Sequence, residues 1–525
     1  MLGYILTAFV ALSLFSYLLI YPVVHYFWDP KGLCKYPSLN FLSGITDLAF
    51  IWEANKPFRS NVLREAHKKS PVVRIGPNSL SYGTVTAIKA LEKKDIYGHG
   101  TTCIKDIFYD TLAGTHHHLA DVRDKEDHQR KRRILSSAYA LKNLEGWEHK
   151  VADKTERIIK AFDAQCTPPL KDEIPAPEDL TIDYRTWTNF FTLDAIADIG
   201  LSERLGFLDT GDDLTTAEKM DGTLYKVNYR QCLHSTARAQ AGLVWAYEWF
   251  PFLTELSKVF SSKYRRMWEL NKGWNDIVYH RATQRLKRYK AGEKLEDFFQ
   301  CLMEDKDGNP NGMEWGEIVA EISIMMNAGS DTTAIAMSNV MYQLLKNPSC
   351  LSKLRAEIDS ILEPSEIVAP YDKVRHLPYL RACLDESLRL FPPSTFGLPR
   401  RTPPEGAPIL GDFIPGNTSV SISAYVAHRD ESVFPEPDRF RPERWLEEGA
   451  KELQAAFITF STGARGCIGR NISYLEQTVL LASMVHRYEF ALPRKEWELT
   501  RWETFNLMPG PMPLKVWRRR FGSEE

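Results

Sequence analysis

The chain has 525 residues, of which 44% are hydrophobic and 26% charged, a balance typical of folded globular proteins and not of disordered ones. Its formal net charge of −2 provides no overall field that would attract nucleic acid. The eight cysteines are scattered without a CxxC pair, which excludes a disulfide framework and a zinc ribbon and indicates a reducing compartment.

The first stretch of the chain is strongly apolar. Residues 2–28 contain no Asp, Glu, Lys or Arg, and about 20 apolar residues suffice to cross a bilayer. The run is too long for a signal-peptide core, lacks a basic start and ends in aromatic residues. Lys31 and Lys35 follow at once. This pattern predicts a membrane anchor over residues 1–28 with the body of the protein in the cytosol; a buried N-terminal core helix is the alternative.

The rest of the chain shows mostly helical periodicity. Residues 29–45 contain proline and glycine and are predicted to form a hinge, followed by a single domain over residues 46–525. Apolar and polar residues alternate only near 71–83 and 416–428, which predicts short strands. The expected fold is therefore mainly α, of the α+β class, with small sheets and no doubly wound core. Long surface loops are expected at 167–179, 304–312 and 363–373.

Several motifs with a defined chemistry fail on inspection. The segment 305–316 begins like a calcium loop, but Pro310 stands where the turn needs glycine and Gly316 where the loop needs glutamate. The three consecutive histidines at 116–118 cannot converge on one ion from a regular element, so we expect a polar loop there. Neither a GxGxxG sequence nor a P-loop occurs, so the chain has no nicotinamide, flavin or nucleotide motif of its own.

One cysteine has an unusual context. Cys467 lies within the sequence FSTGARGCIG, directly before an apolar helical run. A cysteine at a helix N-terminus faces backbone N–H groups and the positive end of the helix dipole, which lowers the thiol pKa and favours the thiolate. Arg465 adds a nearby cation. A thiolate held in this way suits an iron ligand, whereas the alternative is an ordinary core cysteine.

The spacing Phe460-x-x-Gly463-x-Arg465-x-Cys467-x-Gly469 resembles the haem-binding signature of the cytochrome P450 superfamily. The resemblance implies a helix-rich triangular body with small β-sheets, in which residues 46–525 form a haem-binding monooxygenase domain. It implies that Cys467 is the axial thiolate of haem b, that Arg465 binds a haem propionate, and that Phe460 packs beside the proximal face.

A long helix is predicted over residues 315–347, and its middle breaks the local rules. Gly329 costs about 1 kcal/mol in a helix interior, and Asp331, Thr332 and Thr333 place polar groups in an apolar stretch. These residues resemble the family's oxygen-activation motif. The resemblance implies that Gly329 leaves room for dioxygen and that Asp331 and Thr332 deliver protons. The alternative is that the threonine hydroxyls bond back to the carbonyl of residue i−4.

Glu386 and Arg389 are three residues apart and share a helix face. Alone, such a pair contributes only a few tenths of a kcal/mol. Here it resembles the family's ExxR motif, and the later sequence PDRFRPERW supplies Arg444 as the third member of the network. The implied role is structural, namely to hold the loop that presents Cys467.

Two haem propionates need cations in a partly buried site. Besides Arg465, the sequence LPRR places Arg400 where the family often keeps a second cation. His128 and Arg132 lie one helical turn apart and resemble the family's W-x-x-x-R element, with His in place of Trp. The same segment contains three further cations, which form either a solvated face or a docking patch for an acidic reductase. These are Arg130, Lys131 and Arg133.

The resemblance implies a monooxygenase that inserts one oxygen atom into a lipophilic small molecule. Electrons would come from a separate NADPH-cytochrome P450 reductase, with cytochrome b5 as an additional donor. NADPH and flavins would act only through that reductase. The protein would be a monomer on the endoplasmic reticulum membrane and would not bind nucleic acid.

The substrate pocket is expected at segments 103–119, 394–399 and 503–510, which are mostly apolar and aromatic. The sequences DIFYDTLAG, EDHQRKRR and FNLMPGPMPLKVWRRR are similar to the fungal benzoate para-hydroxylase and pisatin demethylase branches. This favours tailoring in fungal secondary metabolism over benzoate detoxification. The alternatives from other classes are a haem-thiolate isomerase or dehydratase, which tends to lack the Asp–Thr pair, and a non-catalytic haem protein.

Overall fold

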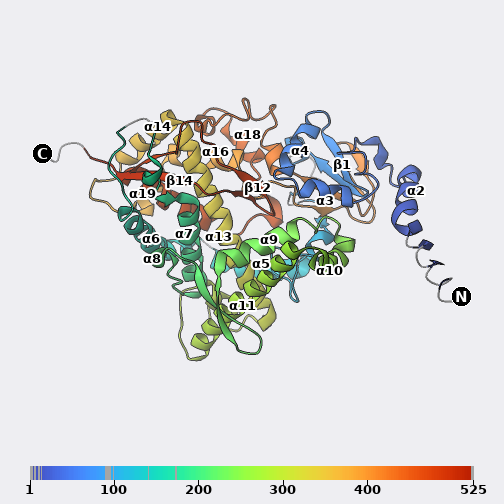
Figure 1. Cartoon of the computed structure of the whole chain (residues 1–525), viewed down its shortest axis with the longest axis horizontal. Helices are drawn as coiled ribbons and strands as arrows, with labels where there is room; N and C mark the ends of the chain where they lie inside the picture. Colours follow the sequence, from blue (N-terminus) through green and yellow to red (C-terminus); the bar gives the residue numbers. More distant parts are fainter. Residues whose placement is uncertain are drawn as a thin grey trace.

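The computed structural model describes residues 4, 8–9, 12–13, 15–88, 96–98, 100–139, 141–171 and 174–521 (Figure 1). The predicted anchor, residues 1–28, therefore lies partly outside the described residues. Its described end forms a π-helical turn, Ser16–Ile20, and helix α2, Tyr21–Trp28, which project from the body in Figure 1. Within the described part of the chain, no helix combines the length and apolarity needed to cross a membrane.

The elements have the following bounds. The helices are α2 Tyr21–Trp28, α3 Leu48–Ala54, α4 Arg59–His67, α5 Lys125–Ala138, α6 Leu141–Asp163, α7 Tyr184–Leu201, α8 Phe207–Thr210, α9 Tyr229–Ala241, α10 Phe250–Phe260, α11 Ser262–Lys290, α12 Phe298–Met303, α13 Trp315–Lys346, α14 Pro348–Asp359, α15 Tyr371–Val374, α16 Pro378–Leu390, α17 Ala424–Ala427, α18 Ala450–Ala456 and α19 Arg470–Arg487. The strands are β1 Val72–Gly76, β2 Ser79–Tyr82, β3 Ile104–Lys105, β4 Ile182–Asp183, β5 Leu214–Glu218, β6 Leu224–Asn228, β7 Arg400–Arg401, β8 Ala407–Ile409, β9 Asp412–Ile414, β10 Ser419–Ile422, β11 Tyr488–Ala491, β12 Arg501–Glu503, β13 Leu507–Pro509 and β14 Pro513–Arg518.

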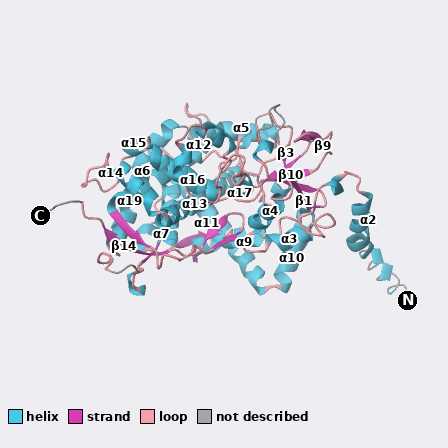
Figure 2. Ribbon diagram, turned by 90° about the horizontal axis from the view of Figure 1, so that it is seen from above, coloured by secondary structure: helices cyan, strands magenta, loops and turns pink. Residues whose placement is uncertain are grey.

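The structure confirms the helix-rich fold with small sheets. Helix α13 crosses the middle of the body and packs on α7, α16 and α19 (Figure 1). A capping box fixes the start of α13. The Glu314 side chain accepts the backbone N–H of Glu317, and the Glu317 side chain accepts the backbone N–H of Glu314. In Figure 2, β14 lies near one end of the molecule and β1, β3, β9 and β10 lie near the other, with helices and further short strands between them. The predicted helix over 315–347 is thus confirmed, and it forms the spine against which the site is built.

The largest described sheet has the strand order β1-β2-β10-β7-β3. The prediction of strands at 71–83 is confirmed by β1 and β2. At 416–428 the prediction is only partly right, because β10 ends at Ile422 and α17 begins two residues later. Ser423 causes this change, since its hydroxyl accepts the backbone N–H of Val426 and caps the helix. Within the sheet, Lys105 of β3 pairs with Arg400 of β7, which brings two distant cations side by side.

Of the three predicted loops, 304–312 contains an isolated bridge between Glu304 and Pro310. The segment 363–373 ends in α15, which begins at Tyr371. In the segment 167–179, residues 172–173 lie outside the described residues.

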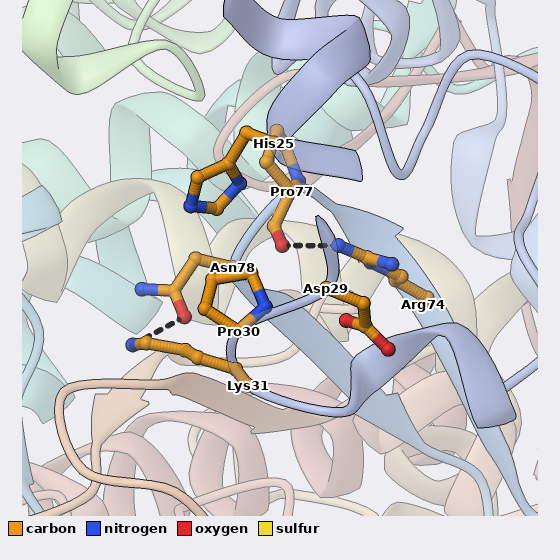
Figure 3. A pocket seen from close by; sticks show the side chains of 7 residues that line it. All are labelled: His25, Asp29, Pro30, Lys31, Arg74, Pro77 and Asn78. Atoms are coloured by element: carbon orange, nitrogen blue, oxygen red, sulfur yellow. Dashed lines mark hydrogen bonds between the residues drawn. The ribbon is translucent and has the colours of Figure 1, made fainter. Parts of the chain in front are cut away.

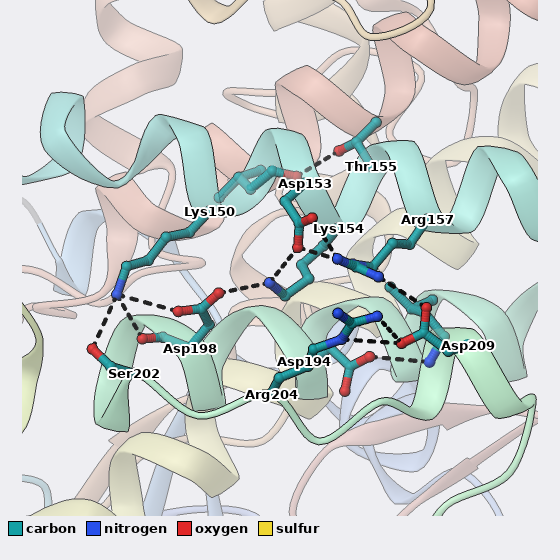
Figure 4. A network of polar contacts seen from close by, with 12 residues as sticks. Lys150, Asp153, Lys154, Thr155, Arg157, Asp194, Asp198, Ser202, Arg204 and Asp209 are labelled. Carbon is teal, nitrogen blue, oxygen red and sulfur yellow. Dashed lines mark hydrogen bonds and ion pairs between the residues drawn. The ribbon is translucent and has the colours of Figure 1, made fainter. Parts of the chain in front are cut away.

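Helix α7 is fixed to α6 and α8 by a polar network (Figure 4). Lys154 Nζ lies 2.6 Å from a carboxylate oxygen of Asp198 and 2.7 Å from one of Asp153. Arg157 links Asp153 to Asp209 at 2.8 and 3.0 Å. Lys154 is almost fully buried, so its charge needs compensation, which a carboxylate on each side provides. The network holds α7 in the position from which it contacts α13.

The segment that follows α2 is attached to the body beside a cavity of about 180 Å³ (Figure 3). Lys31 Nζ donates to Asn78 Oδ1 at 2.9 Å and to the carbonyl oxygens of Gly416 and Asn417 at 2.9 and 3.1 Å. Arg74, on the other side of the cavity, donates to the carbonyl oxygen of Pro77 at 2.7 Å. The predicted hinge is therefore hydrogen-bonded to the sheet region at this point.

Candidate functional site

Cys467 lies at the end of a tight loop before α19. Its backbone N–H donates to the carbonyl oxygen of Phe460 at 2.8 Å, which closes the loop. Gly463 adopts a φ of +71°, and a Cβ there would lie 2.4 Å from the carbonyl oxygen of Tyr97. Glycine is therefore required at this position by both conformation and space. Gly469 has no such constraint, since a Cβ there would meet only the Tyr139 ring at 3.9 Å. The Phe460 ring packs on Tyr474, 5.2 Å between centroids.

The thiol of Cys467 is accessible although protein surrounds it. Burial raises its pKa above the ordinary value, and this outweighs the opposite effects of the Gly469 N–H, Arg132 and Arg470. The expected net lowering of the thiol pKa is therefore wrong for the protein alone. Arg465 is not among the cations that lower the pKa of the Cys467 thiol. Its guanidinium donates instead to the carbonyl oxygens of Val122 and Arg123 at 2.7 and 3.1 Å. A metal ion deprotonates a coordinating thiol outright, so the sulfur suits an iron ligand even though its own pKa is raised.

The middle of α13 has an accessible patch within an otherwise buried segment. Ala328 is exposed and Gly329 and Thr332 are half-buried, whereas their neighbours Ser330 and Asp331 are buried. The Thr332 hydroxyl donates to the Ala328 carbonyl oxygen at 2.8 Å, so the bond to residue i−4 considered above is present.

Gly329 has a packing role that was not expected from the sequence. A Cβ on Gly329 would lie 2.7 Å from Ile196 of α7. The glycine therefore permits the close approach of α7 to α13.

Asp331 does not face the same way as Thr332. Its Oδ1 atom accepts hydrogen bonds from His234 Nε2 at 2.9 Å, from Arg185 at 3.2 Å and from the Asn189 amide at 3.3 Å. Burial alone would raise the pKa of Asp331, but His234 and Arg185 outweigh burial and hold the pKa well below its usual range. The carboxylate is therefore ionised at neutral pH. None of the three donors was expected from the sequence.

The structure brings together the four residues predicted to bind propionates and adds a fifth. Arg400 and Arg465 both act on Lys105, and Arg465, Lys105 and Arg132 act on His128, so Lys105 belongs to the group as well. Lys105 was missed by sequence reasoning, because only the β3–β7 register places it beside Arg400. Among the described residues, none of the five forms an ion pair with a carboxylate.

The cations of this group lower the pKa values of their neighbours within the group. Burial and Arg400 lower the pKa of Arg465 to about 10. Burial, Arg465 and Lys105 lower the pKa of His128 to about 4, so its ring is neutral at pH 7. Burial, Arg400 and Arg465 also lower the pKa of Lys105 well below its ordinary value. Asp121, Asp124 and Asp127 offset this only in part and form no ion pair with the cluster among the described residues. A partly buried cluster of cations that lacks ion pairs fits a ligand that carries carboxylates.

The predicted Glu–Arg–Arg network is present and fully buried. Glu386 Oε1 accepts from Arg389 at 2.9 Å and from Arg444 at 3.0 Å, and Oε2 accepts from Arg389 at 2.9 Å and from the Trp445 indole at 3.0 Å. Arg389 donates further to the carbonyl oxygens of His428 and Pro437 at 2.8 and 2.7 Å. Every strong donor around Glu386 thus has an acceptor, as a buried charged group requires.

His428 connects this network to the cysteine loop and was missed by sequence reasoning. Burial and Arg389 lower its pKa to about 3. Its Nε2 accepts the backbone N–H of Ile458 at 2.9 Å, so Nδ1 carries the proton and donates to the Arg389 carbonyl oxygen at 3.2 Å. Ile458 lies two residues before Phe460, so the network reaches the segment that presents Cys467. No local sequence signal marks this histidine.

The three further basic residues of α5 do not form one free patch. Arg130 pairs with Asp127 and Glu317, and Lys131 is buried with Glu317 at 2.7 Å. Only Arg133 of the three is exposed. Two of the three cations therefore join α5 to α13 rather than facing a partner.

The histidines at 116–118 form a polar loop, as expected. His117 and His118 lie 3.3 and 3.2 Å from the two carboxylate oxygens of Asp121. Within the described ranges, no group of three or more His, Cys, Asp or Glu residues could hold a metal ion.

The family model for cytochrome P450 matches residues 51–516, which include every residue of the site described above. The chain belongs to the cytochrome P450 family. It is 29% identical to the benzoate 4-monooxygenase bphA of Aspergillus niger over 491 residues, 92% of each chain. It is 30% identical to the cytochrome P450 monooxygenase efuB of Hormonema carpetanum over 488 residues, 91% of this chain and 90% of the other. It is 27% identical to the tryprostatin B 6-hydroxylase of Neosartorya fischeri over 90% of this chain and 80% of the other.

This cytochrome P450 is accordingly a haem-thiolate monooxygenase with haem b as its cofactor. The residues present fit that group. An accessible thiol, a cation cluster without an ion pair and an accessible stretch of α13 are the three features that an iron, two propionates and a distal oxygen site require.

Proposed function

We propose that this P450 oxidises a neutral lipophilic molecule in a fungal secondary-metabolite pathway. The observation that carries the proposal is a buried aromatic cluster in which the three expected pocket segments meet. Phe108, Phe396 and Phe505 come one from each segment, and Phe396 lies 4.9 Å from Phe505 and 6.4 Å from Phe108. Trp245, which follows α9, packs on Phe108 and Phe396 at 5.0 and 5.3 Å.

The charge of this cluster favours a neutral substrate over benzoate. Arg59 lies over the Trp245 and Phe396 rings of the cluster, 4.7 and 5.0 Å from their centroids. Arg59 is compensated by the buried carboxylate of Glu503 at 3.2 Å. A substrate carboxylate placed here would have to compete with Glu503 for the guanidinium. The tryprostatin B 6-hydroxylase relative supports tailoring, whereas the benzoate 4-monooxygenase relative supports the alternative of benzoate 4-hydroxylation.

We assign the site residues as follows. Cys467 would hold the haem iron through its thiolate, and the loop closed by Phe460 and Gly463 presents this residue. Arg465, Arg400, Arg132, His128 and Lys105 bind the propionates; His128, being neutral, contributes a hydrogen bond and not a charge. When bound, the haem supplies thiolate-ligated iron that activates dioxygen with two electrons delivered singly.

The protein's own part in the reaction is to exclude water and to supply protons. The Thr332 hydroxyl must release the Ala328 carbonyl before it can donate toward the oxygen site, a rotation about one side-chain bond. Asp331, the residue before Thr332, is negatively charged. It accepts each proton and passes the proton on to Thr332. General acid catalysis of this kind contributes about 10²–10⁴-fold to a rate.

We further propose that residues 1–28 anchor the enzyme to the endoplasmic reticulum membrane, with the body in the cytosol. Phe27 and Trp28 at the end of α2 are 79% and 73% exposed. Trp52 of α3 and Phe252 and Phe260 of α10 are exposed as well, and both helices lie on the side of the molecule from which α2 projects (Figures 1 and 2). Electrons then come from a membrane-bound NADPH-cytochrome P450 reductase, with cytochrome b5 as an additional donor.

The substrate class is tested by a screen for a substrate-induced Soret shift across aromatic acids, terpenoids and polyketides. We expect neutral lipophilic compounds to shift the spectrum and benzoate to leave it unchanged. A benzoate-induced shift with NADPH-dependent 4-hydroxybenzoate formation would support the alternative function instead. Product formation without NADPH would indicate an isomerase or dehydratase, and Thr332→Ala should divert electrons from product to peroxide.

A further inference from the structure

Asp331 is a buried acid whose hydrogen-bond donors all converge on one oxygen. His234, Arg185 and Asn189 bind Oδ1, and Oδ2 accepts no hydrogen bond from the described residues. The Asp331 side chain is only 5% exposed. If Asp331 delivers protons to Thr332, as proposed above, each proton must first reach this carboxylate through the groups that enclose it.

Only one of the three donors can pass a proton on. The Arg185 guanidinium stays protonated under all ordinary conditions, and the Asn189 amide neither gains nor loses a proton near neutral pH. Imidazole can accept a proton at one ring nitrogen while it releases another from the second. The chemistry of the donor set therefore singles out His234.

The position of His234 agrees with this selection. Its side chain is 21% exposed, whereas those of Asp331 and Arg185 are 5% and 4% exposed. Its Nε2 binds Asp331, and its Nδ1 forms no hydrogen bond with any described residue. One ring nitrogen thus faces the buried acid, and the other is free to meet water. The ring belongs to α9 and reaches Asp331 of α13 beside Arg185 of α7.

We propose that His234 is the group through which protons enter the Asp331–Thr332 pair. A proton from water binds Nδ1, the N–H bond at Nε2 breaks, and the released proton forms an O–H bond at Asp331 Oδ1. The ring returns to its starting tautomer when Nδ1 releases its proton to water and Nε2, turned away from Asp331 by rotation of the side chain, takes a proton from water. The proposal rests on the roles assigned to Asp331 and Thr332, and it adds a residue on α9 to them.

The decisive variant is His234→Gln. Its amide nitrogen can still donate to Asp331 Oδ1, but an amide cannot pass a proton. A merely structural histidine would be replaced well by glutamine, whereas a proton carrier would not. The matched control is His280→Asn, because His280 Nδ1 lies 2.7 Å from a carboxylate oxygen of Glu218 in a pair remote from the site.

The first readout is the partition of NADPH electrons by the reductase-coupled holoenzyme, with 7-ethoxycoumarin as a neutral aromatic probe. We expect His234→Gln to raise the ratio of peroxide to product plus water at least threefold and to enlarge the solvent isotope effect on that ratio, with both values of the control unchanged. An unchanged ratio and isotope effect in His234→Gln would overturn the proposal. The carbon monoxide spectrum verifies that each variant is folded and haem-loaded.

The second readout does not depend on turnover. In protein with ¹⁵N-labelled histidine rings, the His234 signals are those absent from His234→Gln, and we expect Asp331→Asn to shift the Nε2 signal. If that signal does not respond to Asp331→Asn, the contact is not made in solution and the relay is excluded. Wild-type protein that oxidises no NADPH with reductase would instead contradict the proposed function, and this second readout would then decide on the relay.

Discussion

Replacing Glu476 by methionine should stabilise the protein, and more so as the pH rises. Glu476 lies in α19 with 0% exposure, and neither of its carboxyl oxygens has a hydrogen-bond partner among the described residues. Burial raises the pKa of Glu476 well above its ordinary value of 4.5. The folded protein therefore keeps a proton on Glu476 that the unfolded chain releases above about pH 4.5, so this residue destabilises the fold increasingly with pH.

The size of the effect follows from proton linkage. Each pH unit between the two pKa values of Glu476 costs about 1.4 kcal/mol, so a rise from about pH 5.5 to about pH 7.5 costs about 2.7 kcal/mol. The unfolding entropy of a body of this size is roughly 1 kcal/mol/K. The gain in Tm of Glu476→Met over wild type should therefore be about 3 °C larger at the higher pH.

Calorimetry of the haem-loaded protein at a fixed scan rate measures this difference. Gln477→Met is the matched control, because Gln477 is the next residue of α19, is equally buried and has an oxygen without a partner, but does not titrate. Its effect on Tm should be the same at both pH values. A Tm gain of Glu476→Met that is independent of pH would refute the reasoning, since it would show that Glu476 is not held neutral in the folded state.

Three further outcomes are expected. Cys467→Ser should abolish the red-shifted absorption band of the reduced carbon monoxide complex, and a retained band would exclude Cys467 as the iron ligand. Glu386→Gln should cost about 3–5 kcal/mol, because it leaves the buried charges of Arg389 and Arg444 uncompensated; thermal unfolding and the yield of haem-loaded protein measure it, and an unchanged Tm would contradict the role of the network. Arg400→Met should speed haem transfer to apomyoglobin about tenfold, the loss of one charge-assisted hydrogen bond, whereas an unchanged transfer rate would remove Arg400 from the propionate site.

Features encoded by neighbouring residues could be predicted from the sequence. The helix α13, the strands β1 and β2 and the pairing of Glu386 with Arg389 all depend on periodicity or on spacings of a few residues. The Cys467 loop was found because its glycines, its arginine and its cysteine lie within ten positions. The local rule failed just after β10, because alternation ends at Ser423 and the apolar residues 424–427 form a helix that Ser423 caps.

Features that depend on tertiary contacts could not be predicted. Lys105 joins the cation cluster only because β3 pairs with β7, and His428 reaches Ile458 across 30 positions of sequence. Gly329 matched a motif, yet the direction of its missing Cβ toward Ile196 is set by the packing of α7. The raised pKa of the Cys467 thiol likewise reflects burial, which a helix-terminus argument does not include.

The cation cluster has a consequence for the amount of this protein in the cell. Arg400 and Arg465 each lower the pKa of Lys105, and Arg400 lowers that of Arg465, so these three cations repel one another until carboxylates of a ligand lie between them. A ligand that binds only the folded state stabilises it by mass action, and here the ligand's carboxylates also offset the repulsion among these cations. Scarcity of iron or porphyrin should therefore lower the abundance of the polypeptide itself, through unfolding and proteolysis, so that its level follows haem synthesis without any dedicated regulator.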